Sequence, residues 1–165
     1  MAAGDDPRPG ELVVTRDFDA PRELVFRAWT EPERVRRWWG PEGFTMPYCD
    51  IDLRPGGTFL RCMRAPGGLD FWVTGVFREI VAPELLVFTD SFADKEGNVV
   101  PPTRYGAGSG MPLERLVTVT FEELAGSTRV TVRHAGLPSG EDRDLVRHGW
   151  AGGLESLSGY LSGAS

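Results

Sequence analysis

The chain has 165 residues, an ordinary length for one domain, and 41% of them are hydrophobic, enough for one sizeable core. Its 18 basic and 24 acidic residues give a formal net charge of −6, which disfavours binding to nucleic acid or to an anionic membrane surface. No run approaches the roughly 18 consecutive apolar residues that a membrane span needs.

The first ten residues are acidic, small and rich in Gly and Pro. A signal peptide has a different order, with a basic start followed by an apolar run. We therefore expect a disordered N-terminal tail over residues 1–10, a single domain over residues 11–165, and a cytoplasmic location.

Residues 11–19 are rich in β-forming side chains and predict a first strand that ends before Pro21. A helix should follow, with Asp19 as its cap and Pro21 in its first turn. Thr30 and Glu33 have the spacing of a capping box, which predicts a second short helix.

Two adjacent tryptophans, Trp38 and Trp39, then precede a break at Gly40 and Pro41. Neighbouring indoles point in different directions, so we expect one to cap the core and the other to face the mouth of a cavity. The alternative is that both indoles plug the end of the core.

After this break the chain alternates between runs of about ten residues and turn signals, the pattern of an antiparallel meander. The strands that we expect cover residues 44–53, 58–64, 71–81, 85–91, 113–123 and 129–134. Between the fourth and fifth strands, residues 92–112 are too rich in Gly and Pro for one regular element. A loop of this length is a mobile lid or an inert excursion.

A hairpin with Pro55 and Gly56 at its tip would bring Cys49 opposite Cys62, although a slip of one residue would separate the thiols. In a reducing cytosol we expect two free thiols, with a labile disulfide as the alternative. The cysteine and histidine spacing matches no usual zinc ligand pattern, so no metal or other cofactor is expected.

The last segment predicts one long helix that starts near Pro138, with Ser139 as a fair cap. Its apolar stripe has spacings of three and four and contains Val146, Trp150, Gly153, Leu154, Leu157, Tyr160 and Leu161. Each glycine in a helix costs about 1 kcal/mol relative to Ala. The helix glycines, Gly149, Gly152 and Gly153 among them, therefore suggest close packing or room for a cavity.

This order of elements, a strand, two short helices, six strands and a long helix, resembles the helix-grip or START-like proteins with the birch-pollen-allergen architecture, also called SRPBCC-type domains. Within them the chain resembles homologues of the C-terminal domain of the Hsp90 ATPase activator. The motifs that carry the resemblance are residues 18–21, 29–33, 38–41, 52–57, 75–80, 85–89, 117–121 and 148–150. The resemblance implies an α+β helix-grip fold, in which a curved antiparallel sheet of six to seven strands wraps around the C-terminal helix. Members bind diverse ligands, so it implies less about function.

Strand alternation places two polar residues, Arg115 and His134, on inward faces. The inward sets are Leu113, Arg115, Val117, Val119 and Phe121 on one strand, and Val130, Val132 and His134 on the next. A ligand carboxylate, a nearby Asp or a water-filled mouth would explain an inward charge. Alternatively, both residues lie in water at the rim of the sheet.

The many aromatic residues can line an apolar cavity, or they can fill the core completely. The ligand-binding candidates are Trp38, Trp39, Phe44, Met46, Phe59, Phe71, Phe88, Arg115, Val117, His134, Trp150 and Leu154. The first hypothesis is binding of a hydrophobic or aromatic small molecule by a monomer or homodimer. The second is a chaperone accessory domain, and the third is an enzyme of the cyclase or hydrolase kind, for which no catalytic residue can be named.

Overall fold

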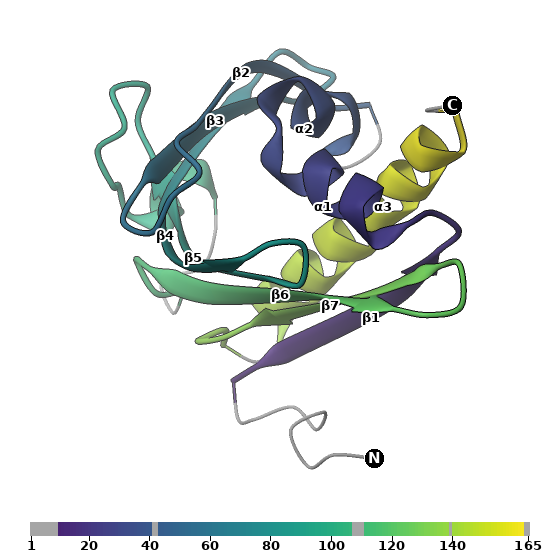
Figure 1. The fold of residues 1–165 in the computed structure, drawn as a ribbon. Helices are drawn as coiled ribbons and strands as arrows, with labels where there is room; N and C mark the ends of the chain where they lie inside the picture. Colours follow the sequence, from purple (N-terminus) through teal and green to yellow (C-terminus); the bar gives the residue numbers. More distant parts are fainter. Residues whose placement is uncertain (1–9, 41–42, 107–110, 139, 164–165) are drawn as a thin grey trace.

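Seven strands form one antiparallel sheet in the order β1-β7-β6-β5-β4-β3-β2, with three α-helices against one side (Figure 1). The computed structural model describes residues 10–40, 43–106, 111–138 and 140–163. Its elements are β1 (Leu12–Phe18), α1 (Arg22–Thr30), α2 (Pro32–Trp38), β2 (Thr45–Ile51), β3 (Thr58–Arg64), β4 (Asp70–Val81), β5 (Leu85–Ala93), the 3-10 helix η2 (Pro102–Tyr105), β6 (Arg115–Glu123), β7 (Thr128–His134) and α3 (Glu141–Gly163). The expected α+β helix-grip fold is confirmed.

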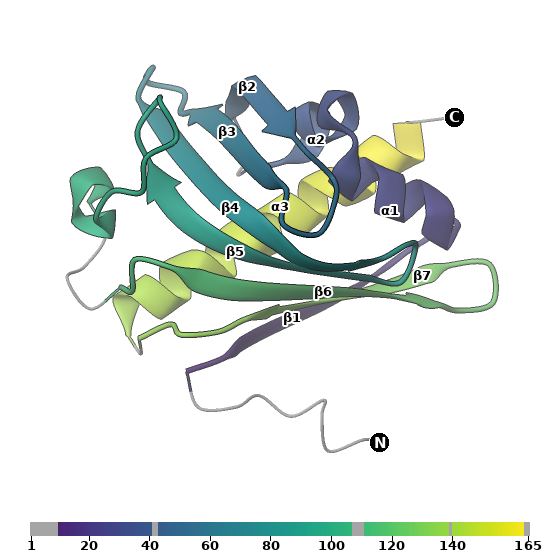
Figure 2. The same cartoon turned by 60° about the vertical axis from the view of Figure 1, so that its left-hand side comes forward.

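The sheet curves around α3, which crosses its concave side (Figure 2). Two irregularities in the ladder increase the curvature, one between β2 and β3 at Thr45/Tyr48 and one between β4 and β5 at Phe77/Glu79. Gly75 on β4 allows a close approach at the bend, because a Cβ there would lie 1.9 Å from the Thr89 carbonyl oxygen. The curved sheet and the crossing helix together create the space in which the site lies.

The predicted helix starts were wrong in detail. Pro21 is the N-cap of α1 and makes no side-chain cap hydrogen bond, so Asp19 does not cap this helix. Thr30 lies in the last turn of α1, where its hydroxyl donates to the Phe26 carbonyl oxygen at 3.0 Å. Glu31 is the N-cap of α2 because Pro32 begins the helix, so the expected capping box does not form.

Two of the strand predictions also need correction. The strand expected over residues 113–123 begins at Arg115, and Leu113, which was assigned to the inward face, lies outside the strand with 53% of its surface exposed. Cys49 pairs with Arg61 rather than with Cys62, which is one residue off the expected register. Both cysteines are free thiols, and burial is the largest cause of the raised pKa of each.

The segment expected to be irregular contains a turn, a short 3-10 helix and several buried residues. Asp94 accepts hydrogen bonds from the backbone of Glu96 and Asn98, which closes a turn after β5. Beyond the turn, Pro102 in η2 and Met111 are buried. Residues 107–110, part of the proposed lid, lie outside the described residues, as do residues 1–9 of the expected N-terminal tail and the expected cap at Ser139.

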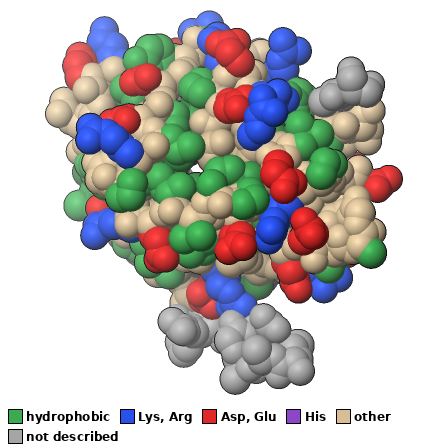
Figure 3. All heavy atoms as spheres, viewed as in Figure 1, with side chains coloured by type: hydrophobic (Ala, Val, Ile, Leu, Met, Phe, Trp, Pro, Cys, Tyr) green, Lys and Arg blue, Asp and Glu red, His purple; other side chains and the backbone are tan. Residues whose placement is uncertain are grey.

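The main core lies between the concave face of the sheet and the helices. Its members come from every layer and include Phe26, Trp29, Trp38, Phe59, Phe88, Val119, Phe121, Val132, Leu154 and Leu157. On the surface shown in Figure 3, basic and acidic side chains are interspersed. No helix in the described part of the chain is both long and apolar enough to cross a membrane.

Candidate functional site

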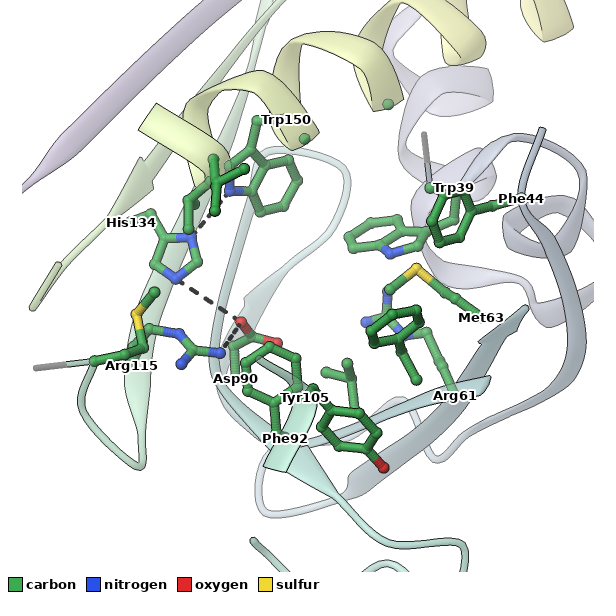
Figure 4. A pocket seen from close by; sticks show the side chains of 18 of the residues that line it. Trp39, Phe44, Arg61, Met63, Asp90, Phe92, Tyr105, Arg115, His134 and Trp150 are labelled. Carbon is green, nitrogen blue, oxygen red and sulfur yellow. Dashed lines mark hydrogen bonds and ion pairs between the residues drawn. The ribbon is translucent and has the colours of Figure 1, made fainter. Parts of the chain in front are cut away.

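A cavity of about 410 Å³ lies between α3 and the concave face of the sheet. Small-molecule sites in proteins commonly have volumes of roughly 300 to 1,000 Å³. Strands β3, β4, β5, β6 and β7 contribute to the wall, and α3, the end of α2 and the segment around η2 complete it (Figure 4). Leu145 of α3, which is exposed to solvent, also contributes to the lining, so the cavity reaches the surface at this end of the helix.

The structure brings eight of the twelve predicted ligand-binding residues to this cavity. They are Trp38, Trp39, Phe44, Phe71, Phe88, Arg115, His134 and Trp150. The other four, Met46, Phe59, Val117 and Leu154, are buried in the core and are not among the residues that line the cavity. The Phe59 ring, for example, does not reach the cavity because it packs against the rings of Phe77 and Phe88 on neighbouring strands of the sheet.

The two adjacent tryptophans differ in their burial and in their contacts. Trp38 is 2% exposed, and its indole Nε1 donates to the Ala28 carbonyl oxygen at 2.8 Å. Trp39 is half-buried and packs edge-on against Trp150 of α3, with ring centroids 5.5 Å apart. Trp38 therefore packs in the core and also contributes to the cavity lining, whereas Trp39 faces the cavity from the wall opposite His134 (Figure 4).

A charged cluster of Asp90, Arg115 and His134 forms one end of the cavity (Figure 4). Arg115 Nη2 donates to Asp90 Oδ2 at 3.0 Å, and Arg115 Nη1 donates to the Pro112 carbonyl oxygen at 3.2 Å. The Arg115 guanidinium also lies over the Phe92 ring, 5.2 Å from its centroid. Arg115 and His134 are only 5% and 3% exposed, so the alternative in which both lie in water at the rim was wrong. A nearby Asp supplies the partner for Arg115.

His134 is held as a neutral imidazole by its surroundings. Trp150 Nε1 donates to His134 Nδ1 at 2.9 Å, which places the imidazole proton on Nε2. Nε2 lies 3.8 Å from Asp90 Oδ2, too far for a hydrogen bond, and is a buried atom with no acceptor. Burial lowers the pKa of His134 from 6.5 to about 4; nearby Asp90 opposes this shift and Arg115 adds to it.

A second arginine, Arg61 on β3, lines the cavity and is 6% exposed. Its guanidinium carbon lies 4.2 Å from the Trp39 ring centroid and 4.1 Å from that of Phe59. Among the described residues it forms no hydrogen bond or ion pair, and its Nε is buried without an acceptor. Burial is the largest cause of the lowered pKa of Arg61. Arg61 is thus a buried cation whose close contacts are aromatic rings and not hydrogen-bond acceptors.

The helix glycines provide part of the cavity. Gly149 and Gly153 both line it, and a Cβ built at either position would meet no atom within 4 Å. Gly153 is buried, so the open space beside it lies inside the protein and not in solvent. At these two positions the helix glycines leave open space beside the cavity wall, as the sequence led us to expect.

Sequence reasoning missed several residues of the cavity wall, Arg61 and Asp90 above all. Strand alternation could have found them. Phe59 and Phe88 were both named as ligand-binding candidates, and the residues two positions further along each strand, which share their face, are Arg61 and Asp90. Tyr105 and Met111 also line the cavity, but they come from the irregular segment, where no periodicity indicates a direction.

The described residues contain no group of three or more His, Cys, Asp or Glu side chains that could hold a metal ion. The titratable groups of the cavity are instead arginines, one carboxylate, a neutral imidazole and the phenol of Tyr105, whose hydroxyl donates to the Ala93 carbonyl oxygen at 2.6 Å. The arrangement is chemically suited to binding an organic molecule by apolar contacts and a few hydrogen bonds.

Residues 19–162 match the family model described as Activator of Hsp90 ATPase homolog 1-like protein. Crystal structures with the same fold include proteins from Nitrosomonas europaea (25% identity, 93% of this chain and 95% of that chain covered, TM-score 0.75) and Chromobacterium violaceum (26% identity, 92% and 96% covered, TM-score 0.74). A third is the AHSA1 protein from Silicibacter pomeroyi, with 24% identity, 94% and 99% covered and a TM-score of 0.73. No curated protein matches the chain.

Proposed function

This chain belongs to the family of Activator of Hsp90 ATPase homolog 1-like proteins, and we propose that it binds a small, largely apolar molecule in the cavity between α3 and the sheet. The observation that carries the proposal is the empty space beside the buried Gly153. A glycine in a helix costs about 1 kcal/mol relative to Ala. Here an alanine methyl group would meet nothing, so close packing does not account for this glycine.

The composition of the wall supports an apolar ligand with some polar character. Aromatic rings from β4, β5, α3 and the residue that follows α2 face the cavity, including those of Phe71, Phe88, Trp150 and Trp39. A few polar groups are placed among them, which is the usual composition of a small-molecule site. Flat aromatic ligands suit such a wall because rings pack favourably edge-on or offset against other rings.

A cavity-filling variant tests the proposal. Gly153→Leu places an isobutyl group in the open space, and we expect it to fold at least as stably as the unmodified protein because leucine has the higher helix propensity. A thermal-shift screen with a library of mono- and bicyclic aromatic compounds should yield compounds that stabilise the unmodified protein. The same compounds should lose their effect on Gly153→Leu.

Gly159→Leu is the matched control. Gly159 lies on the same helix with open space around it, but it is exposed and does not line the cavity. Compounds that act in the cavity must still stabilise this variant. A library without a single stabilising compound, or compounds that act equally on Gly153→Leu, would contradict the proposal.

The two other hypotheses raised by the sequence stay predictions. Action on a chaperone ATPase follows from the description of the family, and its test is the ATPase rate of an Hsp90-type chaperone with and without this protein. Catalysis in the cavity would require a general base, and His134 is a weak candidate because its Nδ1 already accepts a hydrogen bond from Trp150.

A further inference from the structure

The charges in the cavity wall do not balance. The charged lining residues are Arg61, Asp90 and Arg115, whereas His134 of the cluster is neutral because burial lowers its pKa to about 4. Two arginines and one aspartate leave one positive charge among the described residues of the wall. An uncompensated charge in an apolar environment is costly, so the surplus calls for an explanation.

Asp90 is committed to the other arginine. Its Oδ2 accepts the hydrogen bond from Arg115 Nη2 and is also the carboxylate oxygen nearest to His134. Asp90 also attracts Arg61 through space and so opposes the lowering of the Arg61 pKa, but the two side chains form no ion pair. The surplus charge therefore belongs to Arg61.

No other described side chain neutralises Arg61. Cys49 is its neighbour in the β2–β3 ladder, but burial raises the pKa of the Cys49 thiol, so this group is neutral at physiological pH. Trp39 and Phe59 attract the cation by their π faces, but a ring supplies no acceptor that satisfies the five N–H donors of a guanidinium.

Within the described part of the chain, the terminal nitrogens of Arg61 can reach a hydrogen-bond acceptor only in the cavity. Arg61 Nε is fully occluded, whereas Nη1 and Nη2 are not among the occluded unpartnered atoms, and the residue lines the cavity (Figure 4). We propose that Arg61 binds the carboxylate of an apolar, preferably aromatic, organic acid whose body lies among Trp39, Phe71 and Trp150. This inference rests on the proposed function and specifies the chemical class of its ligand.

A carboxylate fits better than a phosphate for reasons of charge and shape. One surplus positive charge is neutralised by a monoanion, whereas a phosphate monoester dianion would leave a net negative charge in the same apolar space. The planar guanidinium also matches a carboxylate in a two-point contact. At the other end of the cavity, Asp90 and Arg115 neutralise each other as an ion pair, so the uncompensated positive charge that attracts the acid lies at Arg61.

The test compares an acid with its uncharged isostere. We would measure the binding of 2-naphthoate and 2-naphthamide to the unmodified protein by isothermal titration calorimetry at neutral pH. The acid should bind tighter by about tenfold or more, because both partners are ionised in the guanidinium–carboxylate pair, whereas only the guanidinium is charged in the pair with the amide. 2-Naphthyl phosphate, the dianionic probe, should bind more weakly than 2-naphthoate.

Two substitutions of Arg61 and one control locate the effect. Arg61→Met should bring the affinities of 2-naphthoate and 2-naphthamide within about threefold of each other. Arg61→Lys retains the charge but not the planar fork and should keep part of the preference for the acid. Arg64→Met, on the same strand, removes an exposed arginine that is paired with Asp70 outside the cavity, and should leave the preference unchanged.

Failure of this inference differs from failure of the proposed function. If the amide binds the unmodified protein as tightly as the acid, if Arg61→Met keeps the preference, or if the phosphate binds tightest, the inference is overturned although the cavity still binds ligands. If neutral compounds bind and neither naphthalene probe does, the inference is likewise overturned. The proposed function fails only when no compound, charged or neutral, binds in a manner that Gly153→Leu abolishes.

Discussion

Arg61 and Arg115 lie in the wall of the same cavity and are buried to the same extent, yet their electrostatic situations are opposite. Arg115 has a carboxylate, a backbone carbonyl oxygen and the face of Phe92 as partners. Arg61 has two aromatic rings and no acceptor among the described residues. Burial alone therefore does not show whether a charged side chain stabilises the fold or binds a ligand. Removal of a buried charge that is paired, such as Arg115, leaves its partner uncompensated and destabilises the fold. A buried charge without an anionic partner, such as Arg61, is available to bind an anionic ligand.

Removal of the partner of Arg115 should have the largest effect on stability. Asp90→Asn leaves the Arg115 guanidinium buried without an anion, and loss of one member of a buried pair typically costs about 3 to 5 kcal/mol. We expect a reduction of this order in the free energy of unfolding, measured by urea denaturation at pH 7. In this variant the Asp90–Arg115 end of the cavity, here called the paired end, would hold an arginine without an anion, as the Arg61 end does.

The matched control is Asp17→Asn. Asp17 binds Arg129 through two hydrogen bonds on the surface, with both side chains about half exposed. Exposed pairs contribute roughly 0.2 to 1 kcal/mol, so this variant should lose far less stability than Asp90→Asn. Equal losses in the two variants would contradict the structural role assigned to the Asp90–Arg115 pair.

The second prediction concerns the pH dependence of the paired end. The pKa of His134 is lowered from 6.5 to about 4 in the folded protein, so the folded state binds fewer protons than the unfolded state within that range. This contribution to stability is fully present above pH 6.5 and is lost as the pH falls toward 4. The shift corresponds to a loss of about 3 kcal/mol, which urea denaturation at a series of pH values would measure.

His134→Gln is the reference for this measurement, because glutamine does not titrate. Its stability curve should be flatter than that of the unmodified protein between pH 6.5 and 4.5. Partners lower the pKa values of Asp17, Glu31, Asp70 and Asp94, so these groups weaken the fold only as the pH falls below their ordinary values of 3.8 to 4.5. Parallel curves for the two proteins would show that His134 is not the group responsible.

Much of the paired end could be predicted from the sequence. Alternation along β6 and β7 placed Arg115 and His134 on the inward face, and a nearby Asp was one of the explanations for an inward charge. The same rule applied to β5 would have named Asp90. Chain order also predicted the fold, because one long helix had to cover a sheet formed by the preceding strands.

The Arg61 end could be predicted only in part. Alternation along β3 places Arg61 between the inward-facing Phe59 and Met63, so its direction was accessible from the sequence. Its lack of an acceptor was not, because that depends on which arginine Asp90 reaches, and this follows from the pairing of β5 with β6 at Asp90 and Arg115. Cys49 lies beside Arg61 because β2 and β3 pair one residue off the expected register from Tyr48 to Ile51, and the turn at Pro55 and Gly56 left this slip open.

The smallest effect on stability is expected at Arg61 itself. Arg61→Met removes cation–π contacts worth about 0.5 to 2 kcal/mol, but it also removes the cost of a desolvated charge, and methionine fits irregular apolar space. These contributions oppose each other, so the free energy of unfolding without ligand should change by no more than about 1 kcal/mol. Arg115→Met, measured beside it, leaves Asp90 without its cation and should be clearly less stable. A large loss in Arg61→Met would mean that this arginine, like Arg115, holds the fold. A small loss of stability, combined with loss of the preference for carboxylates, would show that Arg61 serves ligand binding and Arg115 serves stability of the fold.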